Sequence, residues 1–245
     1  MESFRLVAEK LRKARRVTVL TGAGVSAESG VPTFRGDSGL WRQFRPEELA
    51  TPAAFENDPK LVWEWYDWRR QKVAACEPNA GHRALARLAC LEGRGFAFDL
   101  VTQNVDGLHH LAGSSAVKEL HGSLWRLRCT RCGIEREDRR VPLPRLPPRC
   151  DCGGLERPGV VWFGEALPED VLAQAFEASS RADLFLVVGT SALVYPAASL
   201  PVLARERSGA FLVEINPEVT PLSASVDVGL RGGSAEVLPL LLEAL

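Results

Sequence analysis

A glycine-rich turn directly follows the first apolar run of the sequence, and it limits the possible folds more than any other feature. Residues 17–20 have the β-branched and aliphatic composition of a buried strand. After them, Gly22, Ala23, Gly24 and Ala27 fit the G-x-G-x-x-G/A spacing of dinucleotide-binding turns. Gly22 permits the tight bend, Gly24 lets the backbone approach a pyrophosphate, and Ala27 allows close helix packing. The turn predicts nucleotide binding at a helix N-terminus, with an unliganded turn as the alternative.

Three more short apolar runs follow, at residues 98–102, 184–188 and 211–215, with helical stretches between several of them. This alternation predicts an α/β fold whose large domain is a Rossmann-type parallel sheet. Two segments interrupt it. Residues 33–70 hold eight of the 18 aromatic residues, and residues 129–158 hold four cysteines and five prolines. We expect both to be insertions that form a small domain.

The predicted division of the chain is therefore discontinuous. Residues 1–32, 81–120 and 160–245 form the Rossmann-type domain, residues 33–80 form a cofactor loop and helical module, and residues 121–159 form a zinc-binding module.

A nicotinamide dehydrogenase needs a second strand ending in an acid about 20 residues after the turn. Glu47 and Glu48 lie near that distance, but the prolines at 32, 46 and 52 leave no strand there. Hydride transfer is disfavoured, and Arg35 is instead expected to reach cofactor phosphates from a closing loop.

The cysteine pattern predicts a metal site. Four of the six cysteines form two close pairs, Cys129 with Cys132 and Cys150 with Cys152, and 17 residues separate the pairs. Two such pairs can supply four thiolates to one structural Zn²⁺, which would leave no open coordination position for a substrate. Two disulfides are the alternative, but nothing in the sequence indicates an oxidising compartment. Cys76 and Cys90 lie in helical patterns and are expected to be packed thiols.

Charge and hydropathy exclude several classes of partner. The chain has 30 basic and 31 acidic residues, a formal net charge of −1, so nonspecific binding to nucleic acid is not expected. No apolar run approaches the roughly 20 residues that a membrane span needs. The N-terminal residues lack the apolar stretch of a secretory signal and follow helical spacing instead. These features predict a cytoplasmic protein that has no membrane partner.

Polar residues follow two predicted strands at the edge where open α/β sheets bind ligands. Gln103, Asn104 and Asp106 come after the run 98–102, and His121 comes after a short strand at 117–120. From spacing alone, His121 is equally consistent with a structural histidine and with a general base. His82, at a predicted helix start, is interpreted as structural.

Taken together, the motifs resemble one family, the sirtuins, which are NAD-dependent protein lysine deacylases. The matching stretches occur in the family's order over nearly the whole chain: GAGVSAESGVPTFRG from Gly22, TQNVDGLH from Thr102, HGS from His121, the four cysteines, GVVWFGE from Gly159, VVGTS from Val187 and EIN from Glu214. The resemblance implies a Rossmann-type domain, a small zinc and helical domain, and a cleft between them where NAD meets an acyl-lysine protein or peptide.

The resemblance also implies residue roles. His121, Asn104 and Asp106 would be catalytic, with His121 as the general base for a ribose hydroxyl. The NAD site would comprise Gly22, Ala23, Gly24, Ser26, Thr33, Phe34, Arg35, Trp41, Gln103, Asn104, Val105, Asp106, Gly189, Thr190, Ser191, Asn216 and Ala235. Val160, Val161, Trp162 and Phe163 would pair with the substrate backbone as an added strand. The products would be lysine, nicotinamide and O-acyl-ADP-ribose, and the protein is expected to be a monomer.

Two alternatives remain at this stage. Mono-ADP-ribosyl transfer would use the same NAD site, because it breaks the same glycosidic bond. A zinc-ribbon nucleic-acid module on a nucleotide-sensing domain would explain the arginines around Cys129 and Cys132, although the absent basic surplus argues against it.

One predicted helix bears on the acyl group. Asp58 is its expected cap and Pro59 its first residue, and Tyr66 and Arg69 fall on one face together with Val62 and Val73. On spacing alone, Arg69 either extends to water or binds an anion. Tyr66 and Arg69 resemble the Y-x-x-R pair of the sirtuin branch that accepts succinyl, malonyl or glutaryl lysine, and Ala50 matches the small residue that widens that pocket. The resemblance predicts a preference for acidic acyl groups with some deacetylase activity.

Overall fold

The large domain is built on a parallel sheet, as the alternating pattern predicts. The computed structural model describes residues 2–32, 46–90 and 97–245. In these residues the sheet has the strand order β3-β2-β1-β7-β8-β9, and all its pairs are parallel. The strands are β1 (Arg16–Thr21), β2 (Ala97–Thr102), β3 (Val117–Glu119), β7 (Leu184–Val188), β8 (Phe211–Ile215) and β9 (Val228–Leu230). The four predicted runs are β1, β2, β7 and β8.

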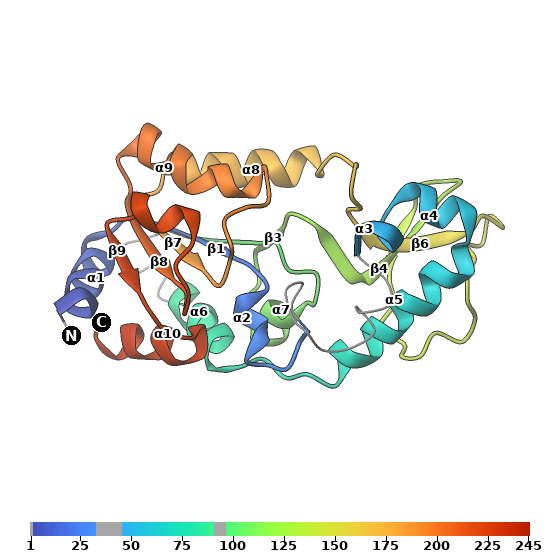
Figure 1. Ribbon diagram of the computed structural model, residues 1–245, viewed down its shortest axis with the longest axis horizontal. Helices are drawn as coiled ribbons and strands as arrows, with labels where there is room; N and C mark the ends of the chain where they lie inside the picture. The colour runs from blue at the N-terminus through green and yellow to red at the C-terminus, as the bar shows by residue number, and fades with distance from the viewer. Residues whose placement is uncertain (1, 33–45, 91–96) are drawn as a thin grey trace.

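Helices cover both faces of this sheet (Figure 1). One layer consists of α1 (Glu2–Lys13), α6 (Ala80–Ala89) and α10 (Ser234–Glu243), and the other of α8 (Glu169–Ser180) and α9 (Leu200–Ser208). Successive strand residues point to opposite faces, so Val19 and Leu186 join the first core while Leu20 and Val187 join the second. Burial on both faces explains why these strands are continuously apolar.

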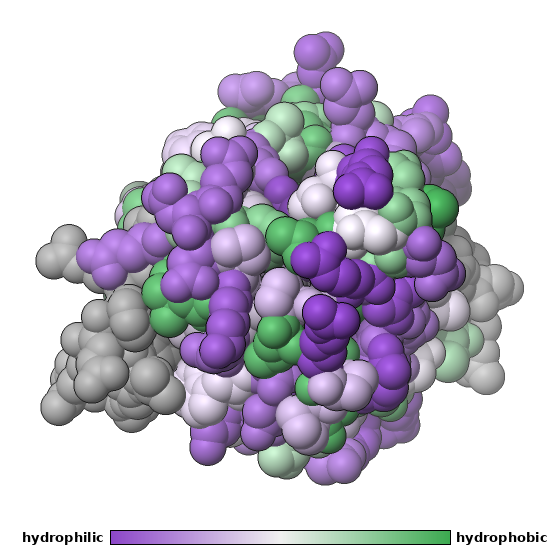
Figure 2. Space-filling model, turned by 90° about the vertical axis from the view of Figure 1, so that its right-hand side faces the viewer, coloured by the Kyte–Doolittle hydropathy of each residue, from purple (hydrophilic) through white to green (hydrophobic). Residues whose placement is uncertain are grey.

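The two interrupting segments of the sequence form one small domain, at the right of Figure 1. Its antiparallel sheet has the order β5-β4-β6, with β4 (Gly122–Cys129), β5 (Glu135–Glu137) and β6 (Glu156–Val160). Helices α3 (Pro46–Leu49), α4 (Pro52–Asn57) and α5 (Pro59–Ala74) pack on it through a shared core that includes Trp63, Leu127 and Trp162. Figure 2 shows this end of the molecule, where hydrophobic residues form separate small areas among hydrophilic ones.

The fold class is confirmed, and so is the start of α5. The Asp58 side chain accepts a hydrogen bond from the Leu61 N–H at 2.9 Å, and Pro59 opens the helix. Residues 46–49 are helical, so they provide no second strand for Glu48 to end. The domain boundaries stay a prediction, and Val160 belongs to β6 of the small sheet.

Two short α-helices and two 3₁₀ turns complete the order of elements in the described residues: α2 (Gly24–Ala27), α7 (Leu108–Leu111) and the turns Ala197–Ser199 and Pro221–Ser225. Within the described ranges, no helix is long and apolar enough to cross a membrane.

Candidate active site

The glycine-rich turn packs directly against the loop after β7. The Gly24 N–H donates to the Gly189 carbonyl at 2.7 Å, and a Cβ on Gly24 would lie 2.7 Å from that oxygen. A Cβ on Gly22 would lie 2.7 Å from the Thr190 Cβ. Close contact between two backbone turns therefore requires both glycines. The expected packing role of Ala27 is wrong, because Ala27 is exposed and the glycines make the close approach themselves.

Behind this turn, Ser26 and Asp106 form the centre of a buried polar network. The Ser26 hydroxyl donates to Asp106 Oδ2 at 2.8 Å and accepts from the Asn104 side-chain amide at 3.1 Å. The Leu108 N–H donates to the other Asp106 oxygen at 2.8 Å. Burial raises the pKa of Asp106, while the hydrogen bonds from Leu108 and Ser26 lower it. Ser26, Asn104 and Asp106, which are 80 residues apart at the extremes, thus meet as predicted for one site.

Two buried histidines continue the network. His82 lies 3.3 Å from the Ser26 hydroxyl, and its ring centroid is 4.9 Å from that of His109. His109 Nε2 lies 2.9 Å from the Thr21 hydroxyl. Burial lowers the pKa of His82 to about 4 and that of His109 to about 3, so both rings are neutral at pH 7. Sequence reasoning gave His109 no role, although its position just after the motif Gln103–Asp106 could have indicated that it lies near the site.

His121 has the geometry of a general base. Its Nδ1 lies 2.9 Å from the Gln103 carbonyl oxygen, which can only accept a hydrogen bond. Nδ1 must therefore carry the proton, and Nε2 keeps its lone pair for a substrate proton. Burial lowers the pKa of His121 below its ordinary value of 6.5, against the raising effect of the Gln103 hydrogen bond. His121 is neutral at pH 7, as a base must be.

Residues that follow β2, β7 and β8 converge at the carboxyl edge of the sheet. The Gln103 side-chain amide donates to the Thr190 hydroxyl at 3.0 Å, and the Asn216 amide donates to the Thr190 carbonyl at 2.9 Å. Val105, Ser191 and Gly189 adjoin these positions in the chain. Ala235 is the second residue of α10, and its N–H donates to the Glu28 carboxylate at 2.9 Å. The predicted residues Thr33, Phe34, Arg35 and Trp41 lie outside the described residues.

The predicted substrate strand borders His121. The Val161 N–H donates to the His121 carbonyl at 2.9 Å, the Trp162 N–H to the Glu165 carboxylate at 2.8 Å, and the Phe163 N–H to the Ala50 carbonyl at 2.9 Å. All three N–H groups are thus bound within the protein. A substrate backbone can reach residues 161–163 only through their carbonyl oxygens.

Two residues that sequence reasoning missed brace this segment. Arg157 forms a forked ion pair with Glu165, with N–O distances of 2.6 and 2.8 Å. Its guanidinium carbon lies 3.4 Å from the centroid of the Trp162 ring. Glu165 belongs to the motif GVVWFGE, so the sequence offered this motif as an indication of its role. Nothing in the local sequence pattern indicated Arg157.

The residues of the predicted acyl pocket lie together in the small domain. The Trp162 indole N–H donates to the Tyr66 hydroxyl at 2.9 Å, and both rings are buried. Arg69 is half-buried, with its guanidinium carbon 4.9 Å from the Trp65 ring centroid and 5.7 Å from that of Tyr66. Burial raises the pKa of Tyr66 to about 12, so its hydroxyl remains a hydrogen-bond donor.

The four predicted metal ligands meet at the end of the small sheet. Their sulfur atoms all lie within 4.8 Å of one another, with 3.5 Å between Cys129 and Cys152 and 3.7 Å between Cys132 and Cys150. A tetrahedral zinc with bonds of about 2.3 Å needs sulfurs about 3.8 Å apart. N–H groups of Cys132 and Arg131 lower the pKa of the Cys129 thiol to about 6. The cluster fits a structural Zn²⁺.

The two remaining cysteines only partly match their prediction. Cys76 is half-buried just beyond the end of α5, but Cys90 is exposed at the C-cap of α6. The helical pattern placed Cys90 near the helix, yet the last turn carries it to solvent, so the expectation of a packed thiol is wrong for Cys90.

Comparisons with known proteins agree with this geometry. Residues 22–196 match the Sir2 family. An NAD-dependent protein deacylase of Aquifex aeolicus is 58% identical over 88% of this chain and 89% of its own, and one of Mycobacterium tuberculosis is 52% identical over 94% and 98%. A crystal structure of a Sir2 homologue in complex with NAD has a TM-score of 0.90 at 50% identity, covering 98% of this chain and 93% of that one.

Proposed function

The chain belongs to the Sir2 family and is an NAD-dependent protein deacylase, and from that premise we propose that it prefers acyl groups that end in a carboxylate. Succinyl and malonyl lysine are the proposed substrates, with acetyl lysine accepted more slowly. The observation that carries the proposal is the position of Arg69, which lies against the buried rings of Trp65 and Tyr66. The alternative was an arginine extended to water.

Electrostatics support an anion in this pocket. Burial lowers the pKa of Arg69, which means that the guanidinium has lost part of its hydration, while the neighbouring Tyr66 and the Asp106 carboxylate raise that pKa. A bound carboxylate would replace the lost hydration with a charged hydrogen bond. The Tyr66 hydroxyl accepts from Trp162 and so has its own proton to donate to the same carboxylate. Ala50 belongs to the same buried cluster as Tyr66, where its methyl group takes up little volume.

The effect of Asp106 on Arg69 also supports adjacent acyl and cofactor sites. When bound, NAD would lie at the glycine-rich turn and the sheet edge and would supply the ribose carbon to which the acyl oxygen adds as nicotinamide leaves. Asn104 and Asp106 would orient the ribose, with Ser26 holding both side chains. His121 Nε2 would then take the proton of a ribose hydroxyl.

Acyl selectivity tests the proposal directly. In Arg69→Met, we expect the ratio of kcat/KM for succinyl over acetyl peptides of one sequence to fall roughly tenfold to a hundredfold, because hydrogen bonds to charged groups are worth about 1.5–3 kcal/mol. Tyr66→Phe should lower the same ratio by less, since it removes a neutral donor. An unchanged ratio in Arg69→Met would show that this arginine does not bind the acyl carboxylate.

The pH dependence tests the assignment of His121. Only the neutral ring can accept a proton, so activity should fall as pH decreases through its pKa. Because burial lowers that pKa, we expect the acidic limb of kcat/KM to have its midpoint below pH 6.5. Steady-state rates between pH 4.5 and 8 on an acetyl peptide would check this, and a midpoint at or above 6.5 would contradict it.

The proposal extends to the state of the enzyme. A monomer would act on acylated proteins in the cytoplasm, where a tetrathiolate zinc site stays reduced. The net charge of −1 gives it no electrostatic affinity for nucleic acid.

A further inference from the structure

Helix α5 presents two neighbouring stripes of side chains to the rest of the small domain. The pocket stripe contains Tyr66 and Arg69. The anchor stripe contains Trp63, Asp67 and Arg70, each one residue beyond a member of the series 62, 66 and 69. Adjacent positions of a helix differ by about 100° around its axis, so the two stripes are rigidly linked. Whatever fixes the rotation of the anchor stripe fixes the direction of the pocket stripe.

The first two members of the anchor stripe, Trp63 and Asp67, bind the cysteine-bearing part of the small domain through directional contacts. The Trp63 indole N–H donates to the Glu156 carbonyl at 2.7 Å. The Asp67 carboxylate accepts the Leu143 N–H at 2.9 Å. Glu156 opens β6, just after Cys152, and Leu143 lies between the two cysteine pairs. The contacts span the insertion that carries the metal ligands.

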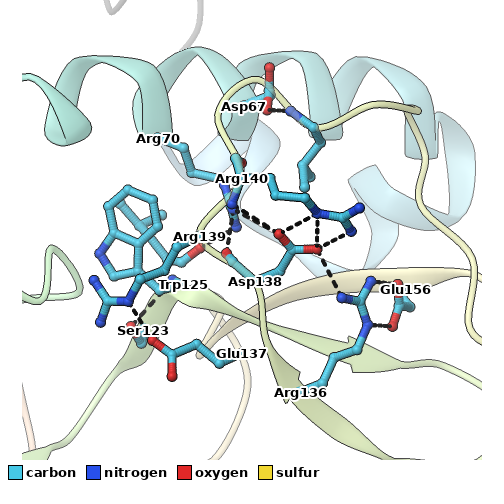
Figure 3. Close-up of polar contacts among 12 residues, drawn as sticks. Asp67, Arg70, Ser123, Trp125, Arg136, Glu137, Asp138, Arg139, Arg140 and Glu156 are labelled. Carbon is cyan, nitrogen blue, oxygen red and sulfur yellow. Dashed lines mark hydrogen bonds and ion pairs between the residues drawn. The ribbon is translucent and has the colours of Figure 1, made fainter.

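Arg70 makes the largest number of these contacts (Figure 3). Its guanidinium donates to the carbonyls of Leu124 at 2.7 Å, Asp138 at 2.5 Å and Arg140 at 3.1 Å. It lies 4.0 Å from the Asp138 carboxylate and 5.1 Å from the centroid of the Trp125 ring. The side chain is only 1% exposed, and burial lowers its pKa. A buried charge of this kind is costly unless its hydrogen bonds are met.

The acceptors of Arg70 are themselves held in place. The Asp138 carboxylate is bound by Arg136 at 2.8 Å and by Arg140 at 2.5 Å, and the hydrogen bond from Arg140 is the main reason that its pKa is low. Arg136 also forms a fork with the buried Glu156 carboxylate, with contacts of 2.8 and 2.7 Å. Figure 3 shows these side chains as one continuous cluster between α5 and the small sheet. Arg70 therefore binds a rigid surface.

From this arrangement we propose that Arg70, the last residue of the anchor stripe, is a positioning residue for the acyl pocket. It fixes the rotation of α5 and so aims Tyr66 and Arg69. Apolar packing of α5 is non-directional and permits small rotations, whereas three hydrogen bonds from one planar fork do not. The inference rests on the proposed function, because it takes Tyr66 and Arg69 as the residues that bind the acyl group.

Kinetics of Arg70→Lys and Arg70→Met test the inference. Lysine keeps the charge but cannot bridge the carbonyls as a fork, and methionine fills the space without either property. In both variants we expect KM for succinyl peptide to rise about tenfold or more, KM for acetyl peptide to rise less, and KM for NAD to stay within about twofold. The matched control is Lys72→Met, an exposed charge on the same helix, which should change none of these values.

A purely structural role would give a different result. It would lower kcat for both peptides in proportion to the folded fraction, with every KM unchanged, and that outcome would overturn the inference. Hydrogen exchange gives a second readout: protection should fall in residues 59–74 and 138–143 of the variants and stay the same in β7. If neither Arg70 variant folds, Trp63→Phe decides, because it removes one anchor hydrogen bond while keeping a ring. An unchanged succinyl-to-acetyl ratio in that variant would also overturn the inference.

The test separates this inference from the proposed function. If the unmodified enzyme shows no preference for succinyl peptide, the acidic-acyl proposal fails, while positioning by Arg70 is still measured through KM for acetyl peptide. If the preference is present and Arg69→Met removes it, but the Arg70 variants keep it, only the inference fails.

Discussion

His121→Ala is expected to lower turnover about 10²- to 10⁴-fold while leaving NAD binding measurable, because general acid–base catalysis contributes a factor of that size. The Nδ1 proton of His121 is held by the Gln103 carbonyl, which directs Nε2 and its lone pair away from the backbone. Alanine removes that base. It leaves the His121 carbonyl in place to accept the Val161 N–H, so the adjoining segment should stay folded.

Single-turnover rates and calorimetric titration with NAD measure the two halves of this prediction. His110→Gln is the matched control, since His110 is an exposed histidine that contacts Glu119 at 3.4 Å and takes no part in the proposed chemistry. It should retain turnover within about twofold of the parent. Residual turnover above a tenth of the parental rate in His121→Ala would show that another group acts as the base.

Replacing both Cys129 and Cys132 by serine is expected to unfold the small domain. Structural zinc contributes about 10 kcal/mol or more to folding in small zinc modules, which is comparable to the whole stability of a typical domain, about 5–15 kcal/mol. Many hydrogen bonds of the loops on either side of the cluster stay within the segment that carries the cysteines, such as the one from the Thr130 N–H to the Leu155 carbonyl at 2.9 Å. The Arg131 and Cys132 N–H groups, for example, point at the Cys129 sulfur.

Metal analysis, thermal unfolding and limited proteolysis within residues 129–158 check this prediction. The parent protein should bind one zinc per chain, and the double variant none, with rapid cleavage in that segment. Cys90→Ser changes an exposed thiol at the end of α6 and should leave metal content and melting temperature unaltered. A double variant that melts like the parent would mean that the four cysteines hold no structural metal.

Features that depend on residues close together in the chain could be predicted from the sequence. The strands β1, β2, β7 and β8 are visible as short apolar runs, because both faces of the sheet are buried. The start of α5 follows from one capping residue and one proline, Asp58 and Pro59. The four cysteines have ligand spacing, and His121 acquired a specific role only through the family resemblance.

Features that depend on distant partners could not be predicted. The anchoring of Arg70 needs carbonyls from residues 124, 138 and 140, and no periodicity in α5 identifies them. The pairing of Arg157 with Glu165 depends on how β6 turns towards Trp162. Ala27 matched a motif but is exposed, whereas Gly22 and Gly24 make close contacts with Gly189 and Thr190 in the loop after β7.

The central position of β1 in the sheet affects the order in which the protein folds during its synthesis on the ribosome. β1 is flanked by β2 and by β7, and the Arg16 N–H binds the Asp183 carboxylate 167 residues later in the chain. The centre of the sheet therefore cannot close until most of the chain has been synthesised. The buried core of the small domain ends at Trp162, so this domain can fold first, while the edge of β1 that pairs with β7 is still unpaired. Loop closure over this distance is slow, so the late pairing of β1 with β7 should limit the folding rate. Until this pairing is complete, the open strand edge exposes the chain to aggregation.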